Sequence, residues 1–137
     1  MTRRLAIVSL LALVAVFAAA CGSGAGAQEI KSGTVGALTV AIANEDGVLR
    51  HGAQELTVTF KDSSGRTVDV GSASLNFHMP AMGTMAAMND AAQLTTTSTP
   101  GVYRGHVNLQ MPGEWQAQIA YEGPAGAGKG AFAVTAQ

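Results

Sequence analysis

The sequence lacks a second cysteine. Cys21 is the one cysteine among 137 residues, so no disulfide can form within the chain. The folded part must therefore be stable from its hydrophobic core alone. Once a leader of about twenty residues is removed, the remaining chain is long enough for one core and too short for two.

The sequence also lacks an excess of positive charge. When Arg3 and Arg4 leave with the leader, the eight basic residues fall to six against nine acidic ones, a net charge of about −3. This balance argues against nucleic acid as a partner, because phosphate backbones bind clusters of lysine and arginine.

Motifs for catalysis are missing as well. No serine or cysteine stands in a pattern that would pair it with a base. The three histidines, His51, His78 and His106, are far apart and form no HxxxH or HxH pair, although spacing alone leaves a zinc site open. We therefore expect that the protein is not an enzyme.

The N-terminus has the layout of an export signal. Arg3 and Arg4 are followed by residues 5–20, an apolar stretch without charge that ends in three alanines before Cys21. This segment resembles the lipobox of bacterial lipoproteins, although Ala18 stands where leucine is usual. The alternative is cleavage by an ordinary signal peptidase, which would leave Cys21 a spectator thiol.

We therefore expect a signal peptide and signal helix in residues 1–20, a flexible tether in residues 21–32 and one domain in residues 33–137. Acyl chains on Cys21, such as palmitate, would attach the protein to a lipid bilayer. The protein would then lie in the cell envelope, on the periplasmic or extracellular face of a membrane.

Alternation of apolar and polar residues dominates the rest of the chain. Apolar residues recur at every second position in seven segments, which end at turn signals such as Asp62-Ser63-Ser64-Gly65 and Pro112-Gly113. About seven antiparallel strands at this spacing predict an all-β, immunoglobulin-like β-sandwich. Residues 68–70 belong to the predicted strands, and residues 123–130 are predicted to form a loose hairpin loop.

Methionines are concentrated in residues 76–90. Apart from Met1 the chain has five methionines, and four of them lie at positions 79, 82, 85 and 88. Thioether sulfur suits Cu(I), and imidazole suits either copper oxidation state. The candidate copper ligands are His78, Met82, Met85, Met88 and His106, with Trp115 as a residue whose indole face would attract the cation.

A structural interpretation of the same residues competes with the copper site. Methionine is a flexible core filler, and Met79 shares its parity with Leu75 and Phe77, which predicts an inward side chain. His78 and His106 have the opposite parity to their apolar neighbours and should point outward. Met111 and Trp115 flank a turn, as residues at the edge of a core do.

Two segments together resemble a known family. HMPAMGTM, followed by PGVYRGHVNLQMPGEWQAQI, is similar to the YtkA-like and FixH-like envelope domains, which share an MP-x-M motif, a G-x-Y motif and a P-G-x-W turn. The resemblance implies an immunoglobulin-like sandwich linked to copper handling or cytochrome oxidase maturation.

Two functions follow as hypotheses. The first is a lipoprotein that binds or passes on Cu(I) through the Met/His-rich loop. The second is a metal-independent interaction module that docks a membrane transporter or oxidase.

Overall fold

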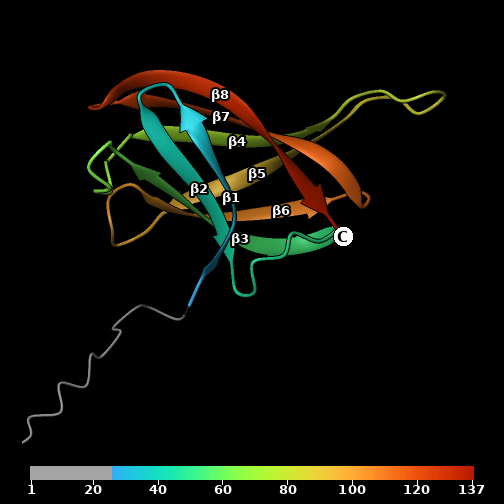
Figure 1. Ribbon diagram of the computed structural model, residues 1–137, viewed down its shortest axis with the longest axis horizontal. Helices are drawn as coiled ribbons and strands as arrows, with labels where there is room; N and C mark the ends of the chain where they lie inside the picture. Colours follow the sequence, from blue (N-terminus) through green and yellow to red (C-terminus); the bar gives the residue numbers. More distant parts are fainter. Residues whose placement is uncertain (1–25) are drawn as a thin grey trace, which may run out of the picture.

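The computed structural model describes residues 26–137, so the predicted signal helix and Cys21 lie outside the described residues. This part of the chain contains eight strands and no helix (Figure 1). The strands are β1 (Gln28–Val35), β2 (Leu38–Asn44), β3 (Gly52–Lys61), β4 (Ser72–Met79), β5 (Met88–Thr96), β6 (Val102–Leu109), β7 (Gly113–Gly123) and β8 (Gly126–Ala136).

The strands form one antiparallel sheet in the order β1-β2-β3-β6-β5-β4-β7-β8, which folds over into two layers. The pairings of β3 with β6, of β4 with β7 and of β7 with β8 are those of an immunoglobulin-like sandwich. The edge strands β1 and β8 lie side by side, and Phe132 of β8 packs against Gly33 of β1. The predicted fold class is confirmed, with eight strands instead of about seven.

β5 joins the two layers. Its first residues, from Met88 to Ala92, pair with β4, and its later residues, from Gln93 to Thr96, pair with β6. The sequence did not predict this strand because its inward positions carry small or polar residues such as Asp90 and Ala92, so hydrophobic alternation is weak.

Three further boundaries differ from the sequence prediction. β1 begins at Gln28, so the domain starts before the predicted boundary at Gly33. Residues 68–70 form no strand. They lie between Thr67 and Gly71, each of which makes only an isolated bridge. Most of the predicted loop in residues 123–130 belongs to β8, which Gly126 begins in a left-handed conformation (φ 97°). Its glycines and alanines pair with β7 but carry no alternating hydrophobicity.

The core lies between the layers and follows the predicted parity. Leu75, Phe77 and Met79 of β4 are buried, and so are Trp115 and Ile119 of β7. At the end of β4 and β7 that contains Gly71, Phe60 packs edge-to-face with Tyr103 and with Tyr121, at centroid distances of 5.6 and 5.7 Å. We call this cluster the aromatic end. The opposite end contains Met79 and Trp115.

Candidate functional site

The methionine segment forms the β4–β5 hairpin. Met79, the last residue of β4, pairs with Met88, the first of β5, and residues 80–87 extend beyond this pair. Figure 1 shows this hairpin, in yellow-green, reaching out of the sandwich on the side away from the start of β1. The candidate ligands Met82 and Met85 therefore lie on a projection and not on the sandwich body.

Met82 and Met85 face each other across a two-residue turn. The Met82 amide donates to the Met85 carbonyl (3.1 Å), and the Met85 amide donates to the Met82 carbonyl (2.8 Å). Gly83 enters the turn with a φ of 56°. Residues paired in this way carry their side chains on the same face, with Cβ atoms about 5 Å apart. These are the exposed large hydrophobic side chains of residues 26–137, at 58% for Met82 and 43% for Met85.

A pocket of about 240 Å³ lies at the base of the hairpin. Met79 and Met82 line it from the hairpin, and Met111 and Trp115 line it from the β6–β7 connection. The remaining lining residues are Pro80, Pro112, Gly113, Glu114, Gln116 and Ala133. We call this space the thioether pocket, because three methionine side chains border it.

The β6–β7 turn is fixed from two sides. The Trp115 indole Nε1 donates to the Met111 carbonyl at 3.1 Å. On the other side, Asp90 of β5 accepts hydrogen bonds from the Gln110 amide (3.1 Å) and from Gln110 Nε2 (2.7 Å). These contacts hold the backbone of Met111 in place beside the pocket.

Glycine at position 113 gives Met79 access to this turn. A Cβ built on Gly113 would lie 3.1 Å from the Met79 Cε methyl, so the end of the Met79 side chain reaches the turn. Gly113 also has a φ of 134°, which strains other residues. Met79 is thus buried (2% exposed), as predicted, and at the same time lines the pocket.

The chemistry of the pocket favours a soft monovalent cation. Thioether sulfur binds Cu(I) in preference to hard cations, and it carries no proton that must be released first. The indole of Trp115 contributes a further surface that attracts cations. The lining side chains that can donate to a metal are three thioethers, the Glu114 carboxylate and the Gln116 amide, so sulfur is the most frequent donor.

His78 lies on the outer face of β4, as its parity predicted. Its Nδ1 is 2.9 Å from Oδ1 of Asn89, and the same oxygen accepts a hydrogen bond from Asn76 Nδ2 at 3.1 Å. The next residue, Met79, points to the opposite face. The structure therefore does not bring His78 together with the methionines of the pocket.

The other predicted ligands are also dispersed. His106 is exposed on the outer face of β6, where its Nε2 lies 3.0 Å from Glu55 Oε1. Met88 pairs with Met79 and packs against the core, and it does not line the pocket. His51, in the β2–β3 connection, contacts the Gln137 carbonyl through Nδ1 at 3.1 Å.

No group of three or more His, Cys, Asp or Glu residues is placed to hold a metal ion within residues 26–137. The three histidines thus do not converge into a common site in this part of the chain. The same residues contain no helix long and apolar enough to cross a membrane.

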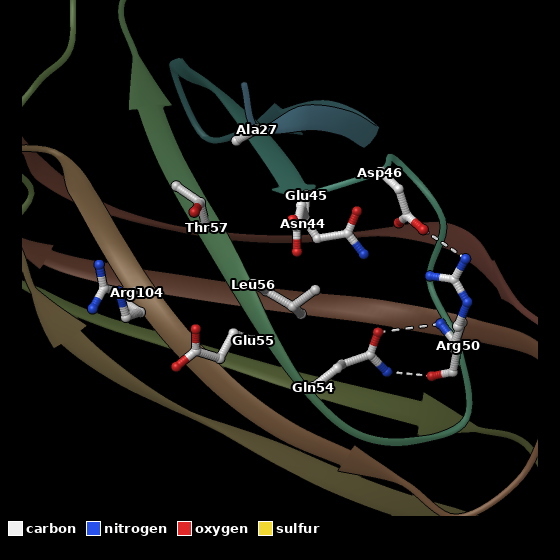
Figure 2. A pocket seen from close by; sticks show the side chains of 10 residues that line it. All are labelled: Ala27, Asn44, Glu45, Asp46, Arg50, Gln54, Glu55, Leu56, Thr57 and Arg104. Atoms are coloured by element: carbon white, nitrogen blue, oxygen red, sulfur yellow. Dashed lines mark hydrogen bonds and ion pairs between the residues drawn. The ribbon is translucent and has the colours of Figure 1, made fainter. Parts of the chain in front are cut away.

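A larger hollow of about 690 Å³ lies over β2 and β3 and is lined mainly by polar and charged residues (Figure 2). Two of its charged side chains pair with each other, Arg50 with Asp46 at 2.6 Å, and the Gln54 side chain bonds to the Arg50 backbone. The bond from Arg50 is the main reason why the pKa of Asp46 lies below its usual value. This hollow contains no sulfur and no histidine.

Comparison with known proteins identifies the family of the chain. The model of the YtkA-like family matches residues 34–120, more than half of the chain. The chain belongs to the YtkA-like family. The match runs from within β1 into β7 and includes every methionine of the thioether pocket. No curated protein and no solved structure matches this YtkA-like chain.

Sequence reasoning placed Met79 and Met111 at the core and did not combine them into a site. A signal was nevertheless present, because each of the two turns that border the pocket carries a Met-Pro dipeptide, Met79-Pro80 and Met111-Pro112. Their convergence depends on the pairing of β4 with β7, which no local pattern in this YtkA-like sequence specifies.

Proposed function

We propose that this YtkA-like protein binds Cu(I) and passes it on, with the thioether pocket as its metal site. The observation that carries the proposal is that Met79, Met82 and Met111, from two separate turns, line one pocket beside Trp115. Cu(I) is the cargo in this proposal, held by sulfur in the cavity between the hairpin and the β6–β7 turn.

The environment of the three sulfurs supports a stable but exchangeable site. Met79 is buried, Met111 is half-buried and Met82 is exposed, so one ligand is open to solvent and to partners. A buried ligand keeps its geometry because packing restricts its rotamers, whereas an exposed one can leave the metal at little cost. Such a gradient of exposure suits a protein that both binds and releases its cargo.

The proposal includes an anchored location. The export signal ending at Cys21 favours an acylated lipoprotein on the outer face of an envelope membrane, in the periplasm or outside the cell. Thioether ligands suit this compartment, because thiols oxidise there more readily. Copper delivery during oxidase maturation is the process that we connect with this placement.

The direct test is an anaerobic Cu(I) competition titration against a coloured chelator. The sample is the full chain in detergent with Cys21→Ala, so that no thiol competes for the metal. We expect micromolar or tighter binding, an affinity about tenfold lower in Met111→Leu, and no change in the control Met88→Leu. Binding in the millimolar range by the unmodified pocket would refute the proposal.

A pH series separates the thioether pocket from the histidine candidates. Thioethers have no proton to lose, so Cu(I) affinity should be nearly equal at about pH 5 and about pH 7.5. An imidazole ligand, by contrast, must be free of its proton to bind a metal, so a site built on His78 or His106 would bind Cu(I) less tightly at the lower pH. A Cu(I) affinity about tenfold or more lower at the lower pH would therefore assign the metal site to the histidines.

A second function rests on a different observation. Met82 and Met85 are exposed on a projecting hairpin, and Met-rich surfaces adapt to several partners. In this alternative the hairpin docks a membrane transporter or oxidase without metal. Leucine at both positions retains bulk and apolar character but removes sulfur. Partner capture that survives this change would favour docking, whereas capture that requires sulfur and Cu(I) would favour the copper function.

A further inference from the structure

We propose that Met82 and Met85 form a capture site for Cu(I) at the hairpin tip, and that Met82 transfers the ion from there into the thioether pocket. This inference rests on the proposed copper function and adds a route of entry to it. The structure assigns Met82 a place in both sites, opposite Met85 in the turn and beside Met79 and Met111 in the pocket.

The capture site follows from the geometry of the turn. The two reciprocal backbone hydrogen bonds, at 3.1 and 2.8 Å, fix Met82 and Met85 as a directly opposed pair. Side chains of such a pair lie on one face within reach of a common ion, and two thioethers are sufficient to hold Cu(I) loosely. Both side chains are substantially exposed, so a donor molecule can approach them without any movement of the sandwich.

The pocket is the natural destination. It offers three thioethers in place of two, and Met79 and Met111 are less exposed than the tip. Sulfur–metal interactions strengthen where water is excluded, so the ion gains affinity as it moves inward. Met85 does not line the pocket, and its role therefore ends when the ion has moved.

The transfer is a ligand exchange without redox chemistry. Cu(I) first bridges the sulfurs of Met82 and Met85. The bond to Met85 then breaks while bonds to Met79 and Met111 form, and the bond to Met82 persists throughout. Copper stays in the Cu(I) state, no proton is released, and the net charge of the complex is unchanged.

The donor or acceptor that fits this tip is an envelope protein with an exposed Cu(I) site of thioether or imidazole ligands. Such a site can share the ion with Met82 and Met85 at the contact, so copper is never free in solution. The projection of the hairpin, with no charged residue among residues 80–87, allows close approach to a partner of either charge.

The test is stopped-flow transfer of copper from the Cu(I)–bicinchoninate complex to the full chain in detergent, with Cys21→Ala in every sample. Loss of the complex's colour reports capture, and the fluorescence of Trp115, the one tryptophan of the chain, reports arrival in the pocket. Met85→Leu is compared with Met111→Leu. Thr84→Ala is the control, since it alters the same turn but leaves both sulfurs.

We expect Met85→Leu to slow transfer about tenfold while its equilibrium affinity changes by no more than about twofold. Met111→Leu should instead weaken Cu(I) affinity and leave the rate of colour loss unchanged. Thr84→Ala should have the same rate and affinity as the chain that carries Cys21→Ala alone. If Met85→Leu leaves the rate of copper transfer unchanged while the chain with Cys21→Ala alone binds Cu(I) tightly, the capture site is refuted and the proposed function is retained. An equal loss of affinity in Met85→Leu and Met111→Leu would also overturn it. Absence of tight binding in all samples would refute both proposals.

Discussion

At one end of β4 and β7 the core is aromatic, and at the other end it is built around methionine. Phe60, Tyr103 and Tyr121 pack against one another at the aromatic end, where the Tyr103 hydroxyl donates to the Gly71 carbonyl at 2.7 Å. The methionine end has Met79 and Met111 around Trp115 and retains a pocket of about 240 Å³.

The two ends differ in how completely their side chains fill the core. Aromatic rings in edge-to-face contact fill space with rigid side chains, and they leave little room for a ligand. Methionine is flexible and polarizable, and the methionines at the other end leave a pocket open. The pocket at the methionine end is therefore the part of the core that the proposed copper function would use.

Loss of the central ring at the aromatic end should have the largest effect on stability. Phe60 is fully buried and contacts both tyrosines, so Phe60→Ala should lower the free energy of unfolding by about 3–5 kcal/mol. Urea unfolding followed by circular dichroism measures the change. A loss below about 1 kcal/mol would contradict the role of this end as the main anchor of the fold.

The opposite pattern is expected for Met79→Leu at the methionine end. This substitution nearly conserves volume, so the free energy of unfolding should fall by no more than about 1.5 kcal/mol. Cu(I) affinity should fall about tenfold, because the buried sulfur of the pocket is lost. Parallel urea and Cu(I) titrations provide both values. Unchanged affinity would place Met79 among the purely structural residues.

Tyr103→Phe removes one hydrogen bond from the aromatic end. Without the bond to Gly71, stability at neutral pH should fall by about 1 kcal/mol. Burial, with a further contribution from Asp69, raises the pKa of Tyr103 in the folded protein. A raised pKa means that the stabilisation is complete below the unfolded value near pH 10 and is lost as the pH rises through the folded value. The difference between the two proteins should therefore shrink above about pH 10, and a constant difference would contradict the burial of this hydroxyl.

The smallest effect is expected at the surface turn beside the aromatic end. Hydrogen bonds from the Ser64 hydroxyl, and then from the Arg66 amide, hold the pKa of Asp62 below its usual value. The ionised carboxylate thus stabilises the turn above about pH 4, and this contribution disappears as the pH falls through the lower folded pKa. Asp62→Ala should lower the melting temperature slightly at pH 7 and by less at about pH 2. An equal decrease at both pH values would argue against the carboxylate as the cause.

Most of the sandwich was predictable because its strands bury one face. Alternation identified the central strands, and the parity of β4 correctly separated Met79 inside from His78 outside. Alternation fails where small side chains replace large ones. Ala92 in β5 and the glycines of β8 pair as regularly as their neighbours, yet they carry too little hydrophobic contrast to mark a strand.

The candidate site was only half predictable for a different reason. The cluster of methionines was visible in the sequence, and Met82 and Met85 do form a pair. The contribution of Met111 depends on the register of β4 against β7, which brings the two Met-Pro turns to the same end of the sandwich. A period-two pattern assigns a residue to a face of a sheet but not to a neighbour across it.

The position of β5 in both layers has a consequence for how the molecule responds to local opening. The two halves of the strand pair with different layers, Met88–Ala92 with β4 and Gln93–Thr96 with β6, so the half next to the hairpin can separate from β4 while the other half stays bonded to β6. Local opening at the methionine hairpin therefore does not require the opening of the whole domain. Amide hydrogens of Met88–Ala92 should exchange with solvent faster than those of β6, which also pairs with β3, and a bound ligand at the tip should slow the exchange of this half of β5 alone.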